Sequence, residues 1–388
     1  MRFRAPFLII LALTLVGSFS LPADTLEPFA DQIEAVEQIR GHRFLAPVSH
    51  RSIPRAELRG FLRDHMEKML PVSTEDYFAI LNELGLIEDS SGALESLLGL
   101  YEAQVLAFYD PFEHVYYSIE PTEGTKEPLE GAALSMMTEF ITVHELTHAL
   151  QDQVFGAGRK LEAVSGNWDA ELAYQAVIEG EATLVMIGSL VRTLGMDLAD
   201  LSLDALTSSL GDLAMVDLGV PDQTPPYFIE ALQFPYLDGL RFVAEAYRRD
   251  GWKGVDQLHA RPPLTTAEIL HPELYYDRID AQERALPAKA EGPASLLLAT
   301  SLGEFHWRFL LGETAAEGWS SDHLTLSRGD GGSLAVASRS SWRNEEEARE
   351  FAETYRAFLA KRGVAANVSL EGDEVITTWP TKSSAPSP

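Results

Sequence analysis

The chain contains no cysteine among its 388 residues. Disulfide bonds, lipid attachment through a cysteine and thiolate metal ligands are therefore excluded, so any metal site must use histidine and carboxylate side chains. Positive charge is also scarce, because 30 Lys and Arg stand against 59 Asp and Glu, which gives a formal net charge of −29. Nucleic-acid binding needs a basic surface and is not expected, and neither is adhesion to anionic membranes.

Long apolar runs are absent beyond the N-terminus, so no internal membrane span is expected. Arg2 and Arg4 precede an apolar run of about 15 residues that ends in small residues, which is typical of a secretory signal peptide. We expect cleavage after Ser20 or Ala23, and export of the mature protein to the periplasm or the extracellular space without stable membrane insertion. An uncleaved N-terminal membrane anchor is the alternative.

Residues 144–148 form an H-E-x-x-H motif, His144-Glu145-Leu146-Thr147-His148. Side chains four residues apart on an α-helix lie on the same face, so His144 and His148 can present two imidazoles to one zinc ion. Glu145 lies beside them, placed to take a proton from a zinc-bound water.

The segment around this motif reads as one helix, because Gly131–Phe155 has no internal Gly or Pro and Gly156 follows as a stop. Leu134, Met137 and Ile141 fall at helical spacing with the two histidines. We therefore predict that the histidines continue an apolar, inward face. The alternative is a buried helix with two structural histidines.

A catalytic zinc needs three protein ligands and an open position for water. A second helix-like run, Asn167–Met186, contains Glu179, Gly180 and Glu181 within an apolar stretch. A buried carboxylate must be paired or bound to a metal. A helical glycine costs about 0.5–1 kcal/mol relative to alanine, so Gly180 predicts close packing of another backbone, which we expect to be the metal helix. For Glu181 alone, a solvated acidic edge is the favoured interpretation.

H-E-x-x-H followed on a second helix by E-G-x-A, or more loosely E-x-x-A, resembles the gluzincin zinc peptidases. The E-G-x-A form, here Glu179 to Ala182, is similar to the aminopeptidase-N-like branch. The E-x-x-A form is similar to membrane-bound and periplasmic peptidases related to the prenyl-protein (CAAX) protease. The resemblance implies a zincin-like core, one Zn²⁺ per chain, and Glu179 as the third ligand beside His144 and His148.

The sequence departs from these families in two places. Thirty residues separate His148 from Glu179, more than in the short-spaced gluzincins, so we expect an inserted loop around Phe155–Gly166. Thr183 stands where several relatives carry an Asp that orients a metal-binding histidine, so that task must fall elsewhere. Asp152 and Asp169 are the candidates; for each, an ordinary cap or surface acid is the alternative.

A weaker likeness covers the stretch from Phe234 to Tyr275. It resembles a group of uncharacterised exported bacterial H-E-x-x-H proteins, and the His-Pro segment of the prenyl-protease branch. It directs attention to His271, which precedes a proline. We predict His271 as the catalytic donor to the oxyanion, with Tyr275 or His259 as less favoured choices and a loop histidine as the alternative.

The order of expected elements predicts an α+β fold that is mainly helical. A hairpin over Gln104–Ile119 directly precedes the metal helix, and a bent helix covers Pro226–Asp250. The expected domains are a signal peptide at 1–20, a zincin-like metallopeptidase domain at 21–290, a C-terminal α+β subdomain at 291–380 and a disordered tail at 381–388. Other expected elements are helices at Leu26–Gly41, Pro54–Met69, Ser73–Leu84, Ser301–Ala316 and Glu345–Lys361, a helical cover at Leu190–Val220, a linker at 281–293, strands near 323–327 and 333–338 with a turn at 330–332, and a hairpin at Asn367–Trp379.

These observations predict an exported zinc-dependent peptidase that acts on polypeptides. His144, His148 and Glu179 would bind Zn²⁺, and Glu145 would activate the attacking water. The alternative is a catalytically silent relative that acts as an envelope chaperone or assembly factor.

Overall fold

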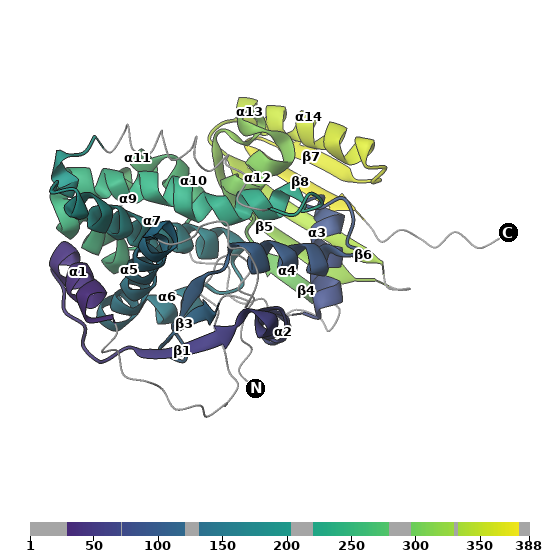
Figure 1. The fold of residues 1–388 in the computed structure, drawn as a ribbon. Coiled ribbons are helices and arrows are strands. Elements are labelled where there is room, and N and C mark those ends of the chain that lie inside the picture. The colour runs from purple at the N-terminus through teal and green to yellow at the C-terminus, as the bar shows by residue number, and fades with distance from the viewer. Residues whose placement is uncertain are drawn as a thin grey trace. The chain divides into compact units, whose positions relative to one another are not determined.

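The computed structural model describes residues 29–70, 72–120, 132–202, 220–278, 296–329 and 333–379. The predicted signal peptide, the linker at 281–293, the turn at 330–332, the tail at 381–388 and most of the predicted cover lie outside these residues. This part of the chain is mainly helical, as predicted, and contains two small sheets (Figure 1). No helix in the described part is both long and apolar enough to cross a bilayer.

The chain forms two compact units, each assembled from separate segments. Unit 1 comprises Met1–Leu70, Ser91–Ala163 and Tyr174–Pro262, and unit 2 comprises Pro71–Ser90, Val164–Ala173 and Pro263–Pro388. The division differs from the predicted boundary at 290/291, because unit 2 begins earlier and includes two short segments from the first half of the chain.

Unit 1 holds the longest of the described helices. Its elements are α1 (Ala30–Arg40), β1 (Ser49–Pro54), α2 (Arg55–Met69), α4 (Ala93–Gln104), β2 (Ala107–Asp110), β3 (Val115–Glu120), α5 (Ala132–Phe155), α6 (Ala157–Val164), α7 (Trp168–Thr193, whose first six residues belong to unit 2), the short η2 (Leu198–Asp200) and α9 (Pro226–Ala260). The predicted hairpin and both predicted metal-site helices are present.

The sheet of unit 1 has the strand order β1-β3-β2. Strands β2 and β3 form the predicted hairpin, in which the Asp110 carboxylate accepts hydrogen bonds from the backbone N–H groups of Phe112 and Glu113 at 2.8 and 2.9 Å. Strand β1 pairs in parallel with β3 and was not predicted. Strand β2 therefore lies at an edge of this sheet.

Helix α5 packs into the core of unit 1 through the apolar residues around its motif. Val143, Leu146, Ala149 and Leu150 are buried with residues of α1, α7 and the hairpin. The first turns are different, because Met137 is 41% exposed. The prediction that Met137 belongs to the inward face is therefore wrong, and only the part of α5 near the motif faces the core.

Two further helices differ from the predictions. The segment after Gly156 is the helix α6 rather than a loop, and Gly158 fits it closely against Pro111, which a Cβ atom at 158 would approach to 2.8 Å. Helix α9 continues to Ala260, but its backbone leaves helical geometry at Asp250 and Gly251. The predicted end at Asp250 therefore coincides with this break.

Unit 2 contains the second sheet, with strand order β4-β5-β6-β8-β7. Its elements are α3 (Thr74–Leu84), α10 (Thr266–Leu270), α11 (Pro272–Asp277), β4 (Leu296–Thr300), α12 (Gly303–Leu311), α13 (Glu313–Ala316), β5 (Trp319–Arg328), β6 (Leu334–Trp342), α14 (Glu345–Lys361), β7 (Asn367–Glu371) and β8 (Glu374–Trp379). Helix α14 has the predicted bounds, whereas β4 was not predicted.

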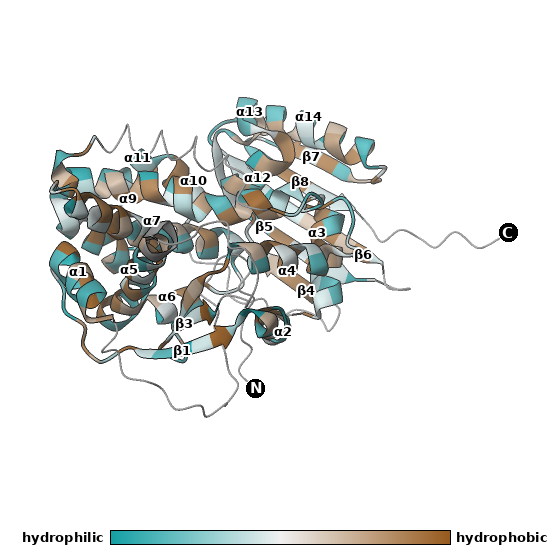
Figure 2. Cartoon of the chain, in the orientation of Figure 1, coloured by the Kyte–Doolittle hydropathy of each residue, from teal (hydrophilic) through white to brown (hydrophobic). Residues whose placement is uncertain are grey.

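Helix α14 is amphipathic and buries one face (Figure 2). The core beneath it is aromatic: the rings of Trp342 and Phe351 stack at 4.3 Å between centroids, and Trp307 meets Phe351 edge-on at 5.0 Å. The Trp307 indole donates to Asp322 at 2.8 Å, which satisfies its buried N–H.

Candidate metal centre

Helix α5 places the two motif histidines side by side. Twenty-four residues form one helix, which ends where Gly156 takes a positive φ of 66°. His144 and His148 are one turn apart, their ring centroids are 4.7 Å from each other, and only 7% and 8% of their surfaces are exposed. Two imidazoles thus meet in a buried site.

Helix α7 brings Glu179 to the same point. Its Oε2 lies 3.0 Å from Nε2 of His144 and 3.4 Å from Nε2 of His148. The three side chains each offer a ligand atom within 4.8 Å of the other two, and all three are buried. Two ligands on a tetrahedral zinc ion, each about 2.1 Å from it, lie roughly 3.4 Å apart, so these residues fit such an ion.

The charges in the site are strongly coupled. Burial opposes ionisation of Glu179, but the two imidazoles outweigh it and lower the pKa of its carboxyl well below the ordinary value. Burial also opposes the charge on His148, but attraction to Glu179 raises its pKa to about 9. Burial lowers the pKa of His144. The carboxylate therefore stays ionised in a nearly water-free place, which is an arrangement that favours a cation.

Glu145 faces the hairpin instead of the ligand atoms. Its Oε2 accepts a hydrogen bond from the backbone N–H of Tyr109 in β2 at 2.9 Å, and 5% of its surface is exposed. Burial raises the pKa of this carboxyl to about 8. A backbone donor in an edge strand thus fixes the orientation of the predicted base, and a divalent cation beside it would favour the ionised form.

Tyr236 on α9 is a site residue that sequence reasoning missed. Its ring lies 5.8 Å from that of His144 at an angle of 21°, and its hydroxyl donates to Glu179. Burial, followed by the charges of Glu179 and Glu145, raises its pKa well above 10, so the hydroxyl keeps its proton. A phenol donor therefore stands beside the candidate ligands.

The contact between α7 and α9 explains how Tyr236 reaches Glu179. A Cβ atom at Gly180 would lie 2.3 Å from the backbone carbonyl of Gly239, and one at Gly239 would lie 2.1 Å from the carbonyl oxygen of Ala176. The prediction that Gly180 allows close backbone packing is confirmed. The partner is α9, however, and not the metal helix as predicted.

His148 is oriented by Gln151, one turn further along α5. The distance from its Nδ1 to Oε1 of Gln151 is 2.9 Å. The two predicted candidates lie elsewhere: the carboxylate of Asp152 bonds with His114 at 2.8 Å, and that of Asp169 accepts from Thr266 at 2.7 Å. The expectation for Asp152 and Asp169 is therefore wrong in this structure.

Glu181 is buried and ionised, contrary to the expected solvated edge. Its carboxylate pairs with Arg40 and His259, and 0% of its surface is exposed. Burial opposes its charge, but these partners lower its pKa to about 2. Because His259 also bonds with the Tyr174 hydroxyl through Nδ1 at 3.1 Å, both of its ring nitrogens are engaged.

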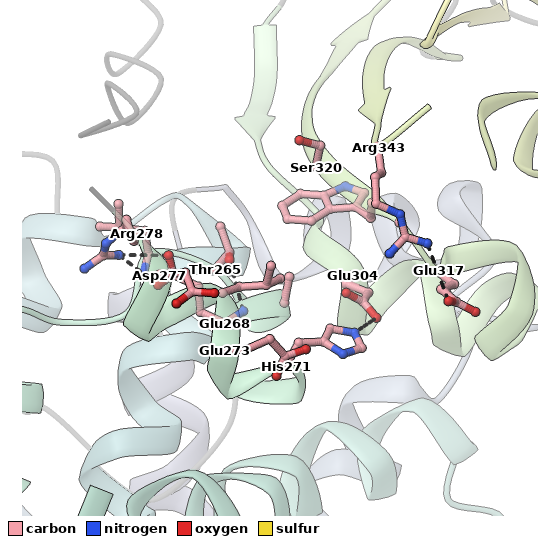
Figure 3. A pocket seen from close by; sticks show the side chains of 15 residues that line it. Thr265, Glu268, His271, Glu273, Asp277, Arg278, Glu304, Glu317, Ser320 and Arg343 are labelled. Carbon is pink, nitrogen blue, oxygen red and sulfur yellow. Dashed lines mark hydrogen bonds and ion pairs between the residues drawn. The ribbon is translucent and has the colours of Figure 1, made fainter. Parts of the chain in front are cut away.

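His271 belongs to unit 2, whereas the three candidate ligands belong to unit 1. It lines a cavity of about 510 Å³ together with Glu268, Glu273, Glu304 and Trp319, among others (Figure 3). Its Nε2 bonds with Glu304 at 2.8 Å, and that bond raises its pKa. These contacts do not test its predicted role as an oxyanion donor, and Tyr275, also in unit 2, is buried.

Comparison with known proteins adds little about the metal centre. A family model described as a domain of unknown function (DUF8575) matches residues 292–385, which lie within unit 2. No curated protein and no solved structure matches the chain. The interpretation of the site therefore depends on its own geometry.

Proposed function

We propose that this protein is an exported zinc-dependent peptidase with a zincin-like catalytic core. The observation that carries the proposal is the convergence of His144, His148 and Glu179, with Oε2 of Glu179 at 3.0 and 3.4 Å from the two Nε2 atoms. Three protein ligands leave a position open on a tetrahedral zinc ion, which distinguishes a catalytic site from a closed structural one.

When bound there, zinc would lower the pKa of a water toward ~7 and polarise a carbonyl group. Glu145 accepts the proton of the attacking water and returns it to the leaving amine, in keeping with its place next to the first metal histidine. The Tyr236 hydroxyl donates to Glu179 in the structure; with a cation as the partner of Glu179, this hydroxyl would be available to donate to the oxyanion that develops on the scissile carbonyl. His271 stays an alternative donor.

A polypeptide is the proposed substrate because of strand β2. Among the described strands, β2 pairs with β3 alone, so its other edge has no strand partner. The Tyr109 N–H of this strand bonds with Glu145, which puts the edge beside the proposed base. An extended peptide can add to such an edge through main-chain hydrogen bonds. Export depends on the predicted signal peptide.

The test combines zinc content with cleavage of an unstructured, casein-like protein. The purified wild type should contain about one zinc per chain and cleave the substrate, and a chelator should abolish cleavage. Glu145→Gln should keep its zinc and lose cleavage. Glu139→Gln, an exposed position on the same helix, is the matched control and should behave like the wild type.

Two outcomes would reject the proposal. Cleavage by Glu145→Gln at the wild-type rate would exclude the assigned base. Failure of the wild type to bind zinc after reconstitution would exclude the metal centre. A zinc-loaded protein that binds unfolded polypeptides without cleaving them would favour the alternative, an envelope chaperone or assembly factor.

A further inference from the structure

Arg40 is the last residue of α1 and lies far from the candidate ligands in the sequence. Its side chain is nevertheless buried in unit 1. Its side chain is 0% exposed, and its Nε donates to Oε1 of Glu181. Its Nη2 donates to Asp256 at 2.7 Å, and its guanidinium lies 4.5 Å from the ring centroid of Trp252. A fully buried arginine needs charged partners, because an unpaired charge in the protein interior is very costly in free energy.

The second oxygen of Glu181 is directed toward the metal helix. Its Oε2 accepts from Nε2 of Gln151 at 2.8 Å and also bonds with His259. Arg40 holds one oxygen of this carboxylate, while Gln151 and His259 hold the other. The carboxylate is therefore fixed in position and orientation.

Gln151 is in turn fixed by its two amide hydrogens. Its Nε2 donates to Glu181 and to the backbone carbonyl of Ile178, at 2.8 and 2.9 Å. The reversed amide would place its oxygen against two acceptors, so only one orientation is compatible with these neighbours. Oε1 of Gln151 must then face Nδ1 of His148, which lies 2.9 Å away.

This orientation decides which nitrogen of His148 carries hydrogen. Oε1 of Gln151 can only accept, so Nδ1 of His148 must donate. A metal-binding imidazole is neutral, and in the neutral ring Nδ1 keeps this hydrogen and the lone pair lies on Nε2, the nitrogen 3.4 Å from Glu179. The hydrogen-bond chain from α1 thus ends on the nitrogen that would bind the metal.

We propose that Arg40, Glu181 and Gln151 form a positioning relay that holds His148 in its metal-binding tautomer. The three are positioning residues, since none of them reaches the ligand atoms. This inference deepens the proposed function and rests on the metal centre assigned there. It also gives α1, which contributes no ligand, a role in metal affinity.

The experiment measures zinc affinity by competition with a chelator, in the full-length protein and in three variants. Gln151→Met keeps the length of the side chain and removes the contact to His148, so zinc should bind about 10- to 100-fold more weakly. Arg40→Met should also weaken zinc binding, by a smaller factor. Arg40→Lys, which keeps a donor for Glu181, should recover part of the loss.

The matched control is Asp256→Asn. It changes the other carboxylate that Arg40 binds, which accepts from Nη2, and does not alter Glu181, Gln151 or His148. It should lower thermal stability and leave zinc affinity unchanged. If zinc affinity instead falls in proportion to stability across all four variants, the relay is only a packing feature and the inference is wrong.

A second measurement does not depend on affinity. In the zinc-loaded, ¹⁵N-histidine-labelled protein, Nδ1 of His148 should carry a slowly exchanging proton, and that proton should exchange faster in Gln151→Met and in Arg40→Met. Unchanged exchange in both variants would overturn the inference while the peptidase proposal stands. A wild type that binds no zinc would overturn both, so the two failures are distinguishable.

Discussion

Two buried carboxylates in unit 1 and two in unit 2 respond to burial in opposite ways. In unit 1, Glu179 and Glu181 face imidazole and guanidinium groups, and these partners overcome burial and lower both pKa values. In unit 2, Asp169 and Asp322 accept hydrogen bonds mainly from hydroxyl, indole and backbone N–H groups. Burial prevails there, raising the pKa of Asp169 to about 8 and that of Asp322 above its ordinary value.

This difference shows that a buried acid acquires its role from its partners. Neutral donors satisfy the lone pairs of a carboxylate but provide no full positive charge, so such an acid holds structure together. Glu179 shares its charge between two imidazoles, and a divalent cation could replace them as its partner. Glu145 combines both features, because it lies in unit 1 but is held by a neutral backbone donor.

Replacement of Glu145 should have the largest effect. General-base catalysis contributes about 10²- to 10⁴-fold, so Glu145→Gln should slow cleavage by that factor. Zinc content should not change, because Glu145 bonds with Tyr109 and not with the ligand side chains. Cleavage rates and zinc content measured on one preparation check this. Loss of zinc in the variant would mean that Glu145 belongs with the ligands.

Two substitutions on α7 compare the units directly. Glu179→Gln should weaken zinc binding by more than about 100-fold, which exceeds the usual effect of an outer contact. Glu171→Gln changes a buried acid two turns earlier, whose pKa burial raises well above 4.5 and whose Oε1 accepts from Gly166. It should bind zinc normally and unfold at a slightly higher temperature. Equal losses of zinc affinity would remove the distinction between the two acids.

The close contact between Gly180 and Gly239 should be the packing contact at which a substitution lowers stability most. Gly180→Ala places a Cβ against backbone atoms of Gly239, which cannot move aside as a side chain could. We expect a loss of about 2–4 kcal/mol of stability, in the range of severe overpacking, and weaker zinc binding as Tyr236 moves from Glu179. Gly188→Ala on the same helix, where the nearest atom would be a side-chain carbon of Ile39 at 3.4 Å, is the control. Thermal unfolding measures both.

The smallest predicted effect is a pH dependence of opposite sign in the two units. Asp169 has a folded pKa of about 8, above its ordinary 3.8, so its contribution to stability is complete below pH 3.8 and is lost as the pH rises through 8. Glu181 has a folded pKa of about 2, below 4.5, so its contribution is present above pH 4.5 and is lost as the pH falls toward 2.

Neutral variants should reveal these two slopes. Relative to the wild type, Asp169→Asn should gain progressively in unfolding free energy as the pH rises from 4 to 8, because it has no proton to lose. Glu181→Gln should be most destabilising near pH 7 and least near pH 3. Denaturant unfolding with a chelator present measures both, and parallel pH profiles for wild type and variants would contradict the comparison.

The sequence predicted those parts of the site that follow from local periodicity. His144, Glu145 and His148 share one helix, and Glu179 was assigned because Glu179–Ala182 resembles the E-G-x-A motif of the gluzincin peptidases. Helix α14 was predicted with its exact bounds because its charged and apolar residues alternate at helical spacing. In each case the residues that carry the signal are neighbours in sequence.

The site residues that were not predicted from the sequence are brought together by the packing of helices that lie far apart in the chain. Tyr236 on α9 and Arg40 on α1 reach the site through helix packing, and Gln151 on α5 does so by contacting α7. No local pattern in their segments reveals that arrangement. The segment after Gly156 was predicted as a loop because the spacing from His148 to Glu179 is longer than in the short-spaced gluzincins, but it forms α6, and Gly158 allows that helix to fit against Pro111. Met137 has helical spacing with the motif and is nevertheless exposed, since the core does not extend that far along α5.

The distance between the ligands along the chain has one further consequence. A cation held by His148 and Glu179 would close a ring of about 30 residues that contains all of α6, in a chain with no disulfide. Such a ring acts as a cross-link that restricts the unfolded chain. Chelation should therefore make this ring a preferred place for attack by other proteases, so that metal supply in the compartment would set the lifetime of the protein.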